Sequence, residues 1–120
     1  MSIQERRRGP RFSVQQAVHF TWKERKRDCR SLNISLEGIK IETESELLPD
    51  DLLELTILAG ESVVKTRGRV IYVEELLDGT FHAGIAFESI SPQGRDALVK
   101  YLSDIVTHGA QRRGILRKIE

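Results

Sequence analysis

The fold is decided by residues 63–87, which have the sequence VVKTRGRVIYVEELLDGTFHAGIAF. The part from Val63 to Val73 is rich in β-branched residues, which favour strands. Asp78-Gly79 is a pair that favours a tight hairpin turn. Beyond this turn, apolar residues recur at every second position and share one face of a second strand: Phe81, Ala83, Ile85 and Phe87. The stretch therefore predicts two long strands joined at Asp78-Gly79.

The residues before this hairpin continue the pattern of short strands. Four further strands are expected, at Val14–Trp22, Arg27–Ile34, Ile39–Thr43 and Leu52–Leu58. The polar stretch 23–26 is expected to be a hairpin loop, and residues 47–51 a turn. In Ile39–Thr43 apolar and charged residues alternate, which is typical of a half-buried strand.

The pattern becomes helical after Ser91-Pro92. Ser91 suits the N-cap and Pro92 the first helical position. The apolar residues that follow have helical spacing: Leu98, Tyr101, Leu102 and Ile105. His108-Gly109 is expected to end the helix. About six strands followed by one helix predict an all-β fold with a C-terminal helix, a small antiparallel β-barrel, because closure removes exposed sheet edges.

The composition is that of one globular domain. The 120 residues are 39% hydrophobic and 31% charged, and the single cysteine, Cys29, has no second cysteine for an internal disulfide. No metal site or cofactor is indicated. No apolar run approaches the roughly 20 residues that a membrane helix needs, and residues 1–11 lack the apolar core of a signal peptide. We therefore expect a cytoplasmic protein without membrane insertion.

The charge is distributed unevenly although the net charge is only +1. The N-terminus and residues 23–30 are basic, residues 37–61 are acidic, and the tail from Arg112 to Lys118 is basic again. A basic N-terminus on a nearly neutral chain favours a local anion site over a broad nucleic-acid surface.

The first candidate site is the segment Arg6-Arg7-Arg8-Gly9-Pro10-Arg11. Pro10 disfavours helical geometry in the residue before it, so an extended or turned segment is expected. The planar arginine fork binds phosphates and the O6 and N7 atoms of guanine, and it stacks on rings. Arg7 and Arg11 span about 13 Å if extended and would suit one compact nucleotide. A solvated terminal run is the alternative.

The second candidate site is Asn33-Ile34-Ser35-Leu36-Glu37-Gly38, which should connect two strands. Asn33 and Ser35 offer short donors and acceptors, and Gly38 permits a positive φ or a close backbone approach. Ile34 and Leu36 are expected to point into the barrel. Taken alone, an ordinary turn explains this stretch equally well.

Together the two segments resemble the PilZ family. That family has Arg-x-x-x-Arg near its N-terminus and Asp/Asn-x-Ser-x-x-Gly about twenty residues later. Arg7 and Arg11 fit the first motif, and Asn33, Ser35 and Gly38 fit the second. Weaker PilZ-like stretches follow at residues 38–41, 48–49, 67–72 and 83–87, so that the resemblance extends from Glu5 to about Glu88.

The resemblance implies a six-stranded barrel that binds cyclic di-GMP, a bacterial second messenger. Arg7 and Arg11 would contact its guanine edges and phosphates, and Asn33 and Ser35 would bind it from the turn that Gly38 shapes. Arg6 is expected to contribute as well. The possible additional ligand residues are Arg8, Gly68 and Arg69.

The expected organisation has three parts: a flexible ligand-binding segment at 1–12, the barrel with its helix at 13–108, and a basic tail at 109–120. Ligand binding would neutralise the repulsion between the arginines and order the segment on the barrel. The ordered segment would then signal to an unidentified protein effector, with motility or exopolysaccharide synthesis as typical outputs. The oligomeric state stays open.

Three other functions remain open. An enzyme is disfavoured because His19, His82 and His108 are scattered and no catalytic motif is present. A barrel that binds RNA or single-stranded DNA would use Phe20 or Trp22 for stacking, but aromatic residues make up only 6% of the chain. A PilZ-like module that binds proteins without any ligand is the third alternative.

Overall fold

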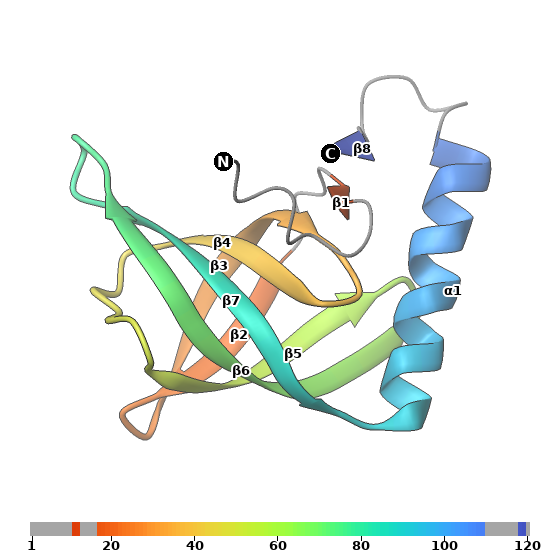
Figure 1. Cartoon of the computed structure of the whole chain (residues 1–120), viewed down its shortest axis with the longest axis horizontal. Coiled ribbons are helices and arrows are strands. Elements are labelled where there is room, and N and C mark those ends of the chain that lie inside the picture. The colour runs from red at the N-terminus through yellow and green to blue at the C-terminus, as the bar shows by residue number, and fades with distance from the viewer. Residues whose placement is uncertain (1–10, 13–16, 110–117, 120) are drawn as a thin grey trace, which may run out of the picture.

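A computed structural model describes residues 11–12, 17–109 and 118–119. The elements in chain order are β1 (Arg11–Phe12), β2 (Ala17–Trp22), β3 (Arg25–Ile34), β4 (Gly38–Thr43), β5 (Leu52–Ala59), β6 (Ser62–Glu75), β7 (Phe81–Ile90), α1 (Pro92–Gly109) and β8 (Lys118–Ile119). Figure 1 shows a curved sheet with α1 along one side of it. Within these residues no helix combines the length and the apolar character needed to cross a membrane.

Six of the strands form a closed antiparallel barrel. Their order is β2-β5-β6-β7-β4-β3, and an additional pairing of β2 with β3 joins the first strand to the last. Every one of these pairings is antiparallel. The predicted fold is therefore confirmed: a six-stranded antiparallel barrel followed by a C-terminal helix.

Two short strands lie outside the barrel. β1 pairs with β3, with Phe12 opposite Ile34, and β8 pairs with β1, with Ile119 opposite Arg11. The sequence predicted neither pairing, because two residues are too few to show a period. Their consequence is that Arg11 lies beside the C-terminal end of β3.

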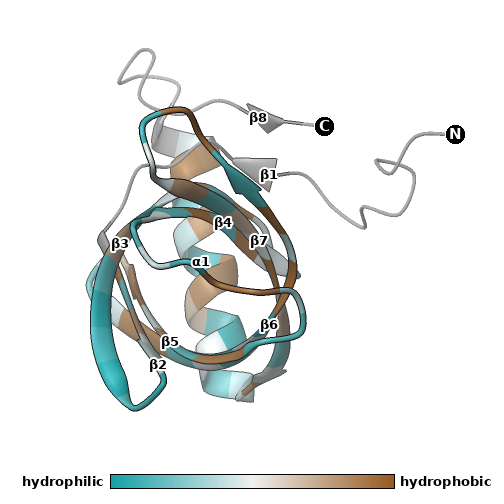
Figure 2. Ribbon diagram, turned by 90° about the vertical axis from the view of Figure 1, so that its left-hand side faces the viewer, coloured by the Kyte–Doolittle hydropathy of each residue, from teal (hydrophilic) through white to brown (hydrophobic). Residues whose placement is uncertain are grey.

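The core follows from the alternation of side chains along the barrel strands. Inward positions are fully buried in every barrel strand: Val18, Phe20, Ile34, Ile39, Ile41, Leu53, Leu55, Ile57, Val64, Val70, Ala83 and Ile85. Leu98 and Leu102 of α1 join this cluster, and Tyr101 and Ile105 pack against it. The predicted apolar stripe of the helix thus covers the barrel. Figure 2 shows, by contrast, that the turn between β2 and β3 and the adjoining part of β3 are hydrophilic.

The hairpin between β2 and β3 is tighter than predicted. Its turn consists of Lys23 and Glu24 alone, with φ of 53° and 64°, so that β3 begins at Arg25 instead of Arg27. Two positive φ angles match the twist of the flanking strands, which is why such two-residue turns are favoured. The sequence did not reveal it because neither residue is the usual Gly or Asn.

The predicted hairpin at Asp78-Gly79 and the predicted start of the helix are both confirmed. At the hairpin from β6 to β7, Gly79 has φ of 90° and the Asp78 carboxylate accepts hydrogen bonds from Thr80 N–H (3.0 Å) and Oγ1 (2.7 Å). At the start of α1, the Gly94 N–H donates to Ser91 Oγ over 2.9 Å, and Pro92 is the first helical residue. Ser91 is therefore the N-cap.

Candidate functional site

The turn between β3 and β4 is built around Ser35, whose side chain is buried with 2% exposure. The Ser35 N–H donates to the Gly38 carbonyl oxygen (2.9 Å), and Ser35 Oγ accepts from the Glu37 N–H (3.1 Å) and lies 3.5 Å from the same Gly38 oxygen. Ile34 is buried and Leu36 packs against the core, as predicted. The serine hydroxyl therefore holds the shape of the turn.

Gly38 is required because β7 lies against it. A Cβ at this position would meet the Ile85 carbonyl oxygen at 2.3 Å. Its φ is not among the positive ones, so the close approach explains this glycine, and not an unusual backbone angle. One residue earlier, the Glu37 carbonyl accepts from the Phe87 N–H over 2.9 Å. The turn is thus hydrogen-bonded to β7 at Glu37 and packed closely against it at Gly38.

The registers of three strands place Gly38 in one row with Arg69. Gly38 is opposite Ala86 of β7, and Ala86 is opposite Arg69 of β6. The next row along these strands contains Ile39, Ile85 and Val70, which are buried. Because adjacent residues of a strand point to opposite faces, the row from Gly38 to Arg69 faces outward. Its ends are about 10 Å apart, two strand spacings.

A second outward row runs parallel to the first. Asn33 of β3 is opposite Lys40, Lys40 is opposite Gly84, and Gly84 is opposite Tyr72 of β6. The two rows lie on the outward side of β3, β4, β7 and β6. We call this surface the four-strand face. Its residues are Asn33, Gly38, Lys40, Arg69, Tyr72, Gly84 and Ala86.

Tyr72 lies across Gly84 on this face. A Cβ at Gly84 would come within 2.2 Å of the Tyr72 ring, so the ring occupies the space that a side chain would fill. Tyr72 itself remains 44% exposed. The four-strand face therefore offers an aromatic ring beside a floor of small residues, Gly38 and Ala86.

Arg69 contributes a guanidinium group to the four-strand face. Its Nε donates to Oε2 of Glu88, and its Nη1 lies 3.8 Å from Oδ1 of Asp50. The bond to Glu88 raises the pKa of Arg69. Its neighbour Gly68, in contrast, is buried: a Cβ there would meet Ile85 Cγ2 at 2.4 Å and Leu55 Cδ1 at 2.9 Å. Gly68 thus packs in the core, and its place at the border of the ligand site stays a prediction.

The predicted arginines are only partly described. Arg11 is in β1, and the pairing of Phe12 with Ile34 brings its backbone level with Ser35 at the turn. Arg6, Arg7 and Arg8 lie outside the described residues. The structure therefore brings Arg11, Asn33, Ser35 and Gly38 to one end of β3, with Arg69 across the four-strand face.

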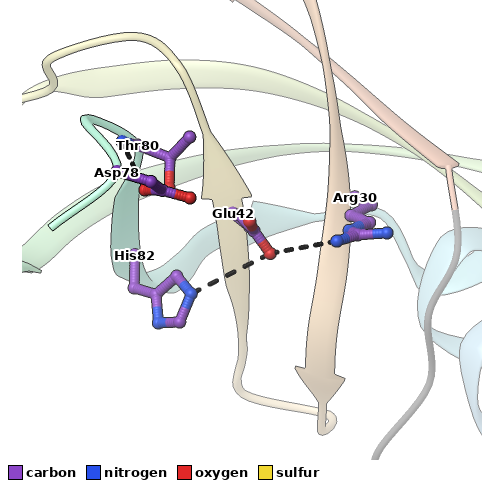
Figure 3. A network of polar contacts seen from close by, with 5 residues as sticks. All are labelled: Arg30, Glu42, Asp78, Thr80 and His82. Carbon is purple, nitrogen blue, oxygen red and sulfur yellow. Dashed lines mark hydrogen bonds and ion pairs between the residues drawn. The ribbon is translucent and has the colours of Figure 1, made fainter. Parts of the chain in front are cut away.

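A third row of polar residues is engaged in its own ion pairs. Figure 3 shows the Glu42 carboxylate between Arg30 (3.3 Å) and His82 (3.9 Å). Beside it, the bonds from Thr80 lower the pKa of Asp78. His82 therefore has Glu42 as a partner.

The structure argues against the alternative functions at the residues that were considered for them. Phe20 is only 1% exposed, so it offers no stacking platform for the alternative of nucleic-acid binding. Trp22 has its ring under Lys23 and Arg27, and its Nε1 donates to Asp51. Burial raises the pKa of Cys29 to about 12, which leaves the thiol protonated and unreactive. The described residues contain no cluster of potential metal ligands.

The sequence alone does not single out Lys40, Tyr72 and Glu88, which the structure places on or beside the four-strand face. The alternation in Ile39–Thr43 does place Lys40 on the outward side. Tyr72 and Arg69, however, are aligned with β7 through an irregularity between Val70 and Tyr72. Register shifts of this kind leave no trace in a single sequence, so the four-strand face emerges only from the structure.

Comparison with known proteins identifies the family. The PilZ domain model matches residues 5–104. No curated protein matches the chain.

Similar solved structures have the same fold. They include the inhibitor of motility MotI/DgrA of Bacillus subtilis (20% identity, TM-score 0.72, 89% of this chain and 53% of that chain). The PilZ domain of YcgR from Escherichia coli with c-di-GMP has 17% identity and a TM-score of 0.72, covering 88% of this chain and 96% of that one. The MrkH–c-di-GMP complex of K. pneumonia has 19% identity and a TM-score of 0.76, covering 89% and 55%.

The chain spans about half the length of the MotI/DgrA and MrkH chains and nearly all of the isolated YcgR domain. The family model covers most of the sequence, and both motifs lie inside the matched range. The chain belongs to the PilZ domain family.

Proposed function

We propose that this chain is a receptor and adaptor for cyclic di-GMP. The observation that carries the proposal is that the β1 backbone and the Asn33–Gly38 turn lie at one end of β3, with Arg69 in the same outward row as Gly38. Membership of the PilZ family supports it, as do similar structures whose ligand is c-di-GMP. At 17–19% identity these structures support the fold alone. The ligand is therefore argued from the residues of this chain.

The ligand has two guanines and two phosphates, and the site supplies groups for both. Arg7 and Arg11 bind guanine edges and phosphates through their planar forks, with Arg6 and Arg8 as additional cations. Asn33 offers an amide on the four-strand face, while Ser35 contributes the turn geometry and the charge of Lys40 attracts phosphate. Gly38 and Ala86 leave room for the flat dinucleotide to approach the backbone.

Tyr72 gives the site a stacking surface. An aromatic ring stacks on a base with about 1–3 kcal/mol, and the exposed Tyr72 ring lies on the same face as Lys40 and Arg69. A guanine placed over this ring would have a phosphate near Lys40. We assign Tyr72 to the binding site on this ground.

Signalling follows from the ordering of residues 1–12. Like charges among Arg6, Arg7, Arg8 and Arg11 disfavour compaction of this segment in the absence of an anion. A ligand with two negative charges removes that repulsion, and the pairing of Phe12 with Ile34 provides the register in which the segment docks. The docked segment then forms a surface for a protein effector. No catalytic step is involved.

The test is a calorimetric titration with cyclic di-GMP, GMP and a single-stranded oligonucleotide. Arg7→Ala and Arg11→Ala should each weaken binding of the cyclic dinucleotide by about 10- to 100-fold, the loss of a charge-assisted contact of about 1.5–3 kcal/mol. Arg25→Ala removes an exposed arginine at the opposite end of β3 and should leave affinity unchanged. A folded protein that binds no cyclic di-GMP would reject the proposal in favour of a ligand-independent interaction module.

A further inference from the structure

The four-strand face has a carboxylate beside its guanidinium. Glu88 lies two residues after Ala86 on β7, at a register irregularity, and its ion pair with the outward Arg69 places its carboxylate on the same side of the barrel. Its Oε2 accepts from Nε of Arg69, and its side chain is 36% exposed. A carboxylate beside a proposed phosphate site needs an explanation, because the two negative charges repel each other.

Guanine supplies that reason. Its N1–H and N2–H₂ are adjacent donors that fit the two oxygens of one carboxylate, whereas adenine has an unprotonated N1 and no 2-amino group. An ionised carboxylate has about four acceptor sites, and Arg69 uses one of them. Glu88 therefore keeps acceptor capacity for a base while Arg69 holds it in place.

We propose that Glu88, positioned by Arg69, reads the Watson–Crick edge of one guanine and selects guanine over adenine in the cyclic dinucleotide. The inference rests on the proposed function and adds a specificity residue to it. It also explains why an acid is compatible with the phosphates: it faces a base edge, and Arg69 neutralises its charge.

A simpler role for Glu88 makes the opposite prediction. If Glu88 and Asp50 only neutralise Arg69, a ligand phosphate must displace them, and removing the Glu88 charge strengthens the binding of every anionic dinucleotide equally. If Glu88 reads a base, the same change weakens binding most for the guanine ligand, less for cyclic di-IMP, which keeps N1–H, and not for cyclic di-AMP. The sign of the effect separates the two roles.

The chain offers a matched control in a second arginine–glutamate pair. Arg67, two residues before Arg69 on β6, donates from Nε to Oε2 of Glu54 over 3.2 Å. Glu54 is on β5, outside the four-strand face. Glu54→Gln therefore removes the same charge from the same kind of pair without touching the proposed reader.

The experiment titrates wild type, Glu88→Gln and Glu54→Gln with cyclic di-GMP, cyclic di-IMP and cyclic di-AMP. Cyclic di-IMP lacks only the 2-amino groups, so the comparison is a double-mutant cycle between Glu88 and that amine. We expect wild type to prefer the guanine ligand over cyclic di-IMP by about 10-fold, the worth of one charge-assisted bond. Glu88→Gln should lose most of that preference, and Glu54→Gln should keep it.

The outcomes distinguish this inference from the function on which it rests. Equal or tighter binding by Glu88→Gln with the preference intact overturns the inference and leaves the receptor function standing. Failure of wild type to bind any of the three dinucleotides overturns the proposed function and the inference with it. Thermal unfolding of Glu88→Gln, compared with Glu54→Gln, checks that a loss of affinity does not reflect a loss of fold.

Discussion

Gly38 lies so close to Ile85 that a Cβ at position 38 would stand 2.3 Å from the Ile85 carbonyl oxygen. Backbone cannot yield as a flexible side chain can, so Gly38→Ala must separate β4 from β7. We expect it to destabilise the protein by about 1–3 kcal/mol, the usual range of overpacking effects, and to weaken cyclic di-GMP binding because the turn moves with β4. Urea denaturation followed by the fluorescence of Trp22, the single tryptophan, measures the change.

A glycine elsewhere provides the control for that experiment. At Gly94, near the start of α1, a Cβ would lie 3.2–3.4 Å from its nearest neighbours, two of which are the side chains of Ile90 and Val64. Gly94→Ala should therefore be close to neutral in stability, since the helix prefers alanine to glycine. A Gly38→Ala protein as stable as Gly94→Ala would contradict the close-packing explanation of the motif glycine.

Tyr72 can be tested separately from the arginines. Tyr72→Ala should weaken cyclic di-GMP binding by about 1–3 kcal/mol, the worth of one stacked base. Tyr72→Phe should bind as wild type does, because the ring and its position over Gly84 are retained. Equal affinities for all three proteins in a calorimetric titration would remove Tyr72 from the proposed site.

The sequence was sufficient for the parts of this molecule that depend on local patterns. Asp78-Gly79 predicted its hairpin and Ser91-Pro92 its helix start, and both are found. The predicted hairpin at residues 23–26 is found but its turn is two residues shorter, because positive φ angles at Lys23 and Glu24 are not visible in composition. The link from Gly38 through Ala86 to Arg69 depends on strand register, which is set by packing across the whole barrel.

Ionisation of Cys29 should lower the folding stability of the protein at alkaline pH. Its pKa is raised from 9.0 to about 12, first by burial and then by the nearby Asp28 carboxylate. The unfolded chain loses the thiol proton near pH 9 while the folded chain keeps it, so the folded state binds more protons between about pH 9 and 12. Stability should therefore fall as pH rises through this window.

The substitution Cys29→Ala removes this ionisation and should flatten that part of the pH profile. Thermal unfolding of both proteins between pH 8 and 11 provides the comparison. A thiol reagent adds a second readout: at pH 8 the native thiol should react much more slowly than the thiol of the urea-unfolded protein. Parallel pH profiles for the two proteins, or fast native labelling, would show that Cys29 is not the titrating group.

Removal of residues 1–12 separates binding from folding. The barrel closes through β2 and β3, and within the part of the chain that the structure describes its buried cluster begins at Val18. A protein beginning at residue 13 should therefore unfold cooperatively at nearly the wild-type temperature. It should nevertheless lose cyclic di-GMP binding, because the arginines and the β1 strand that pairs with β3 are absent. Retained binding would move the ligand contacts onto the four-strand face alone, whereas collapse of the fold would show that β1 is structural and not a docking element.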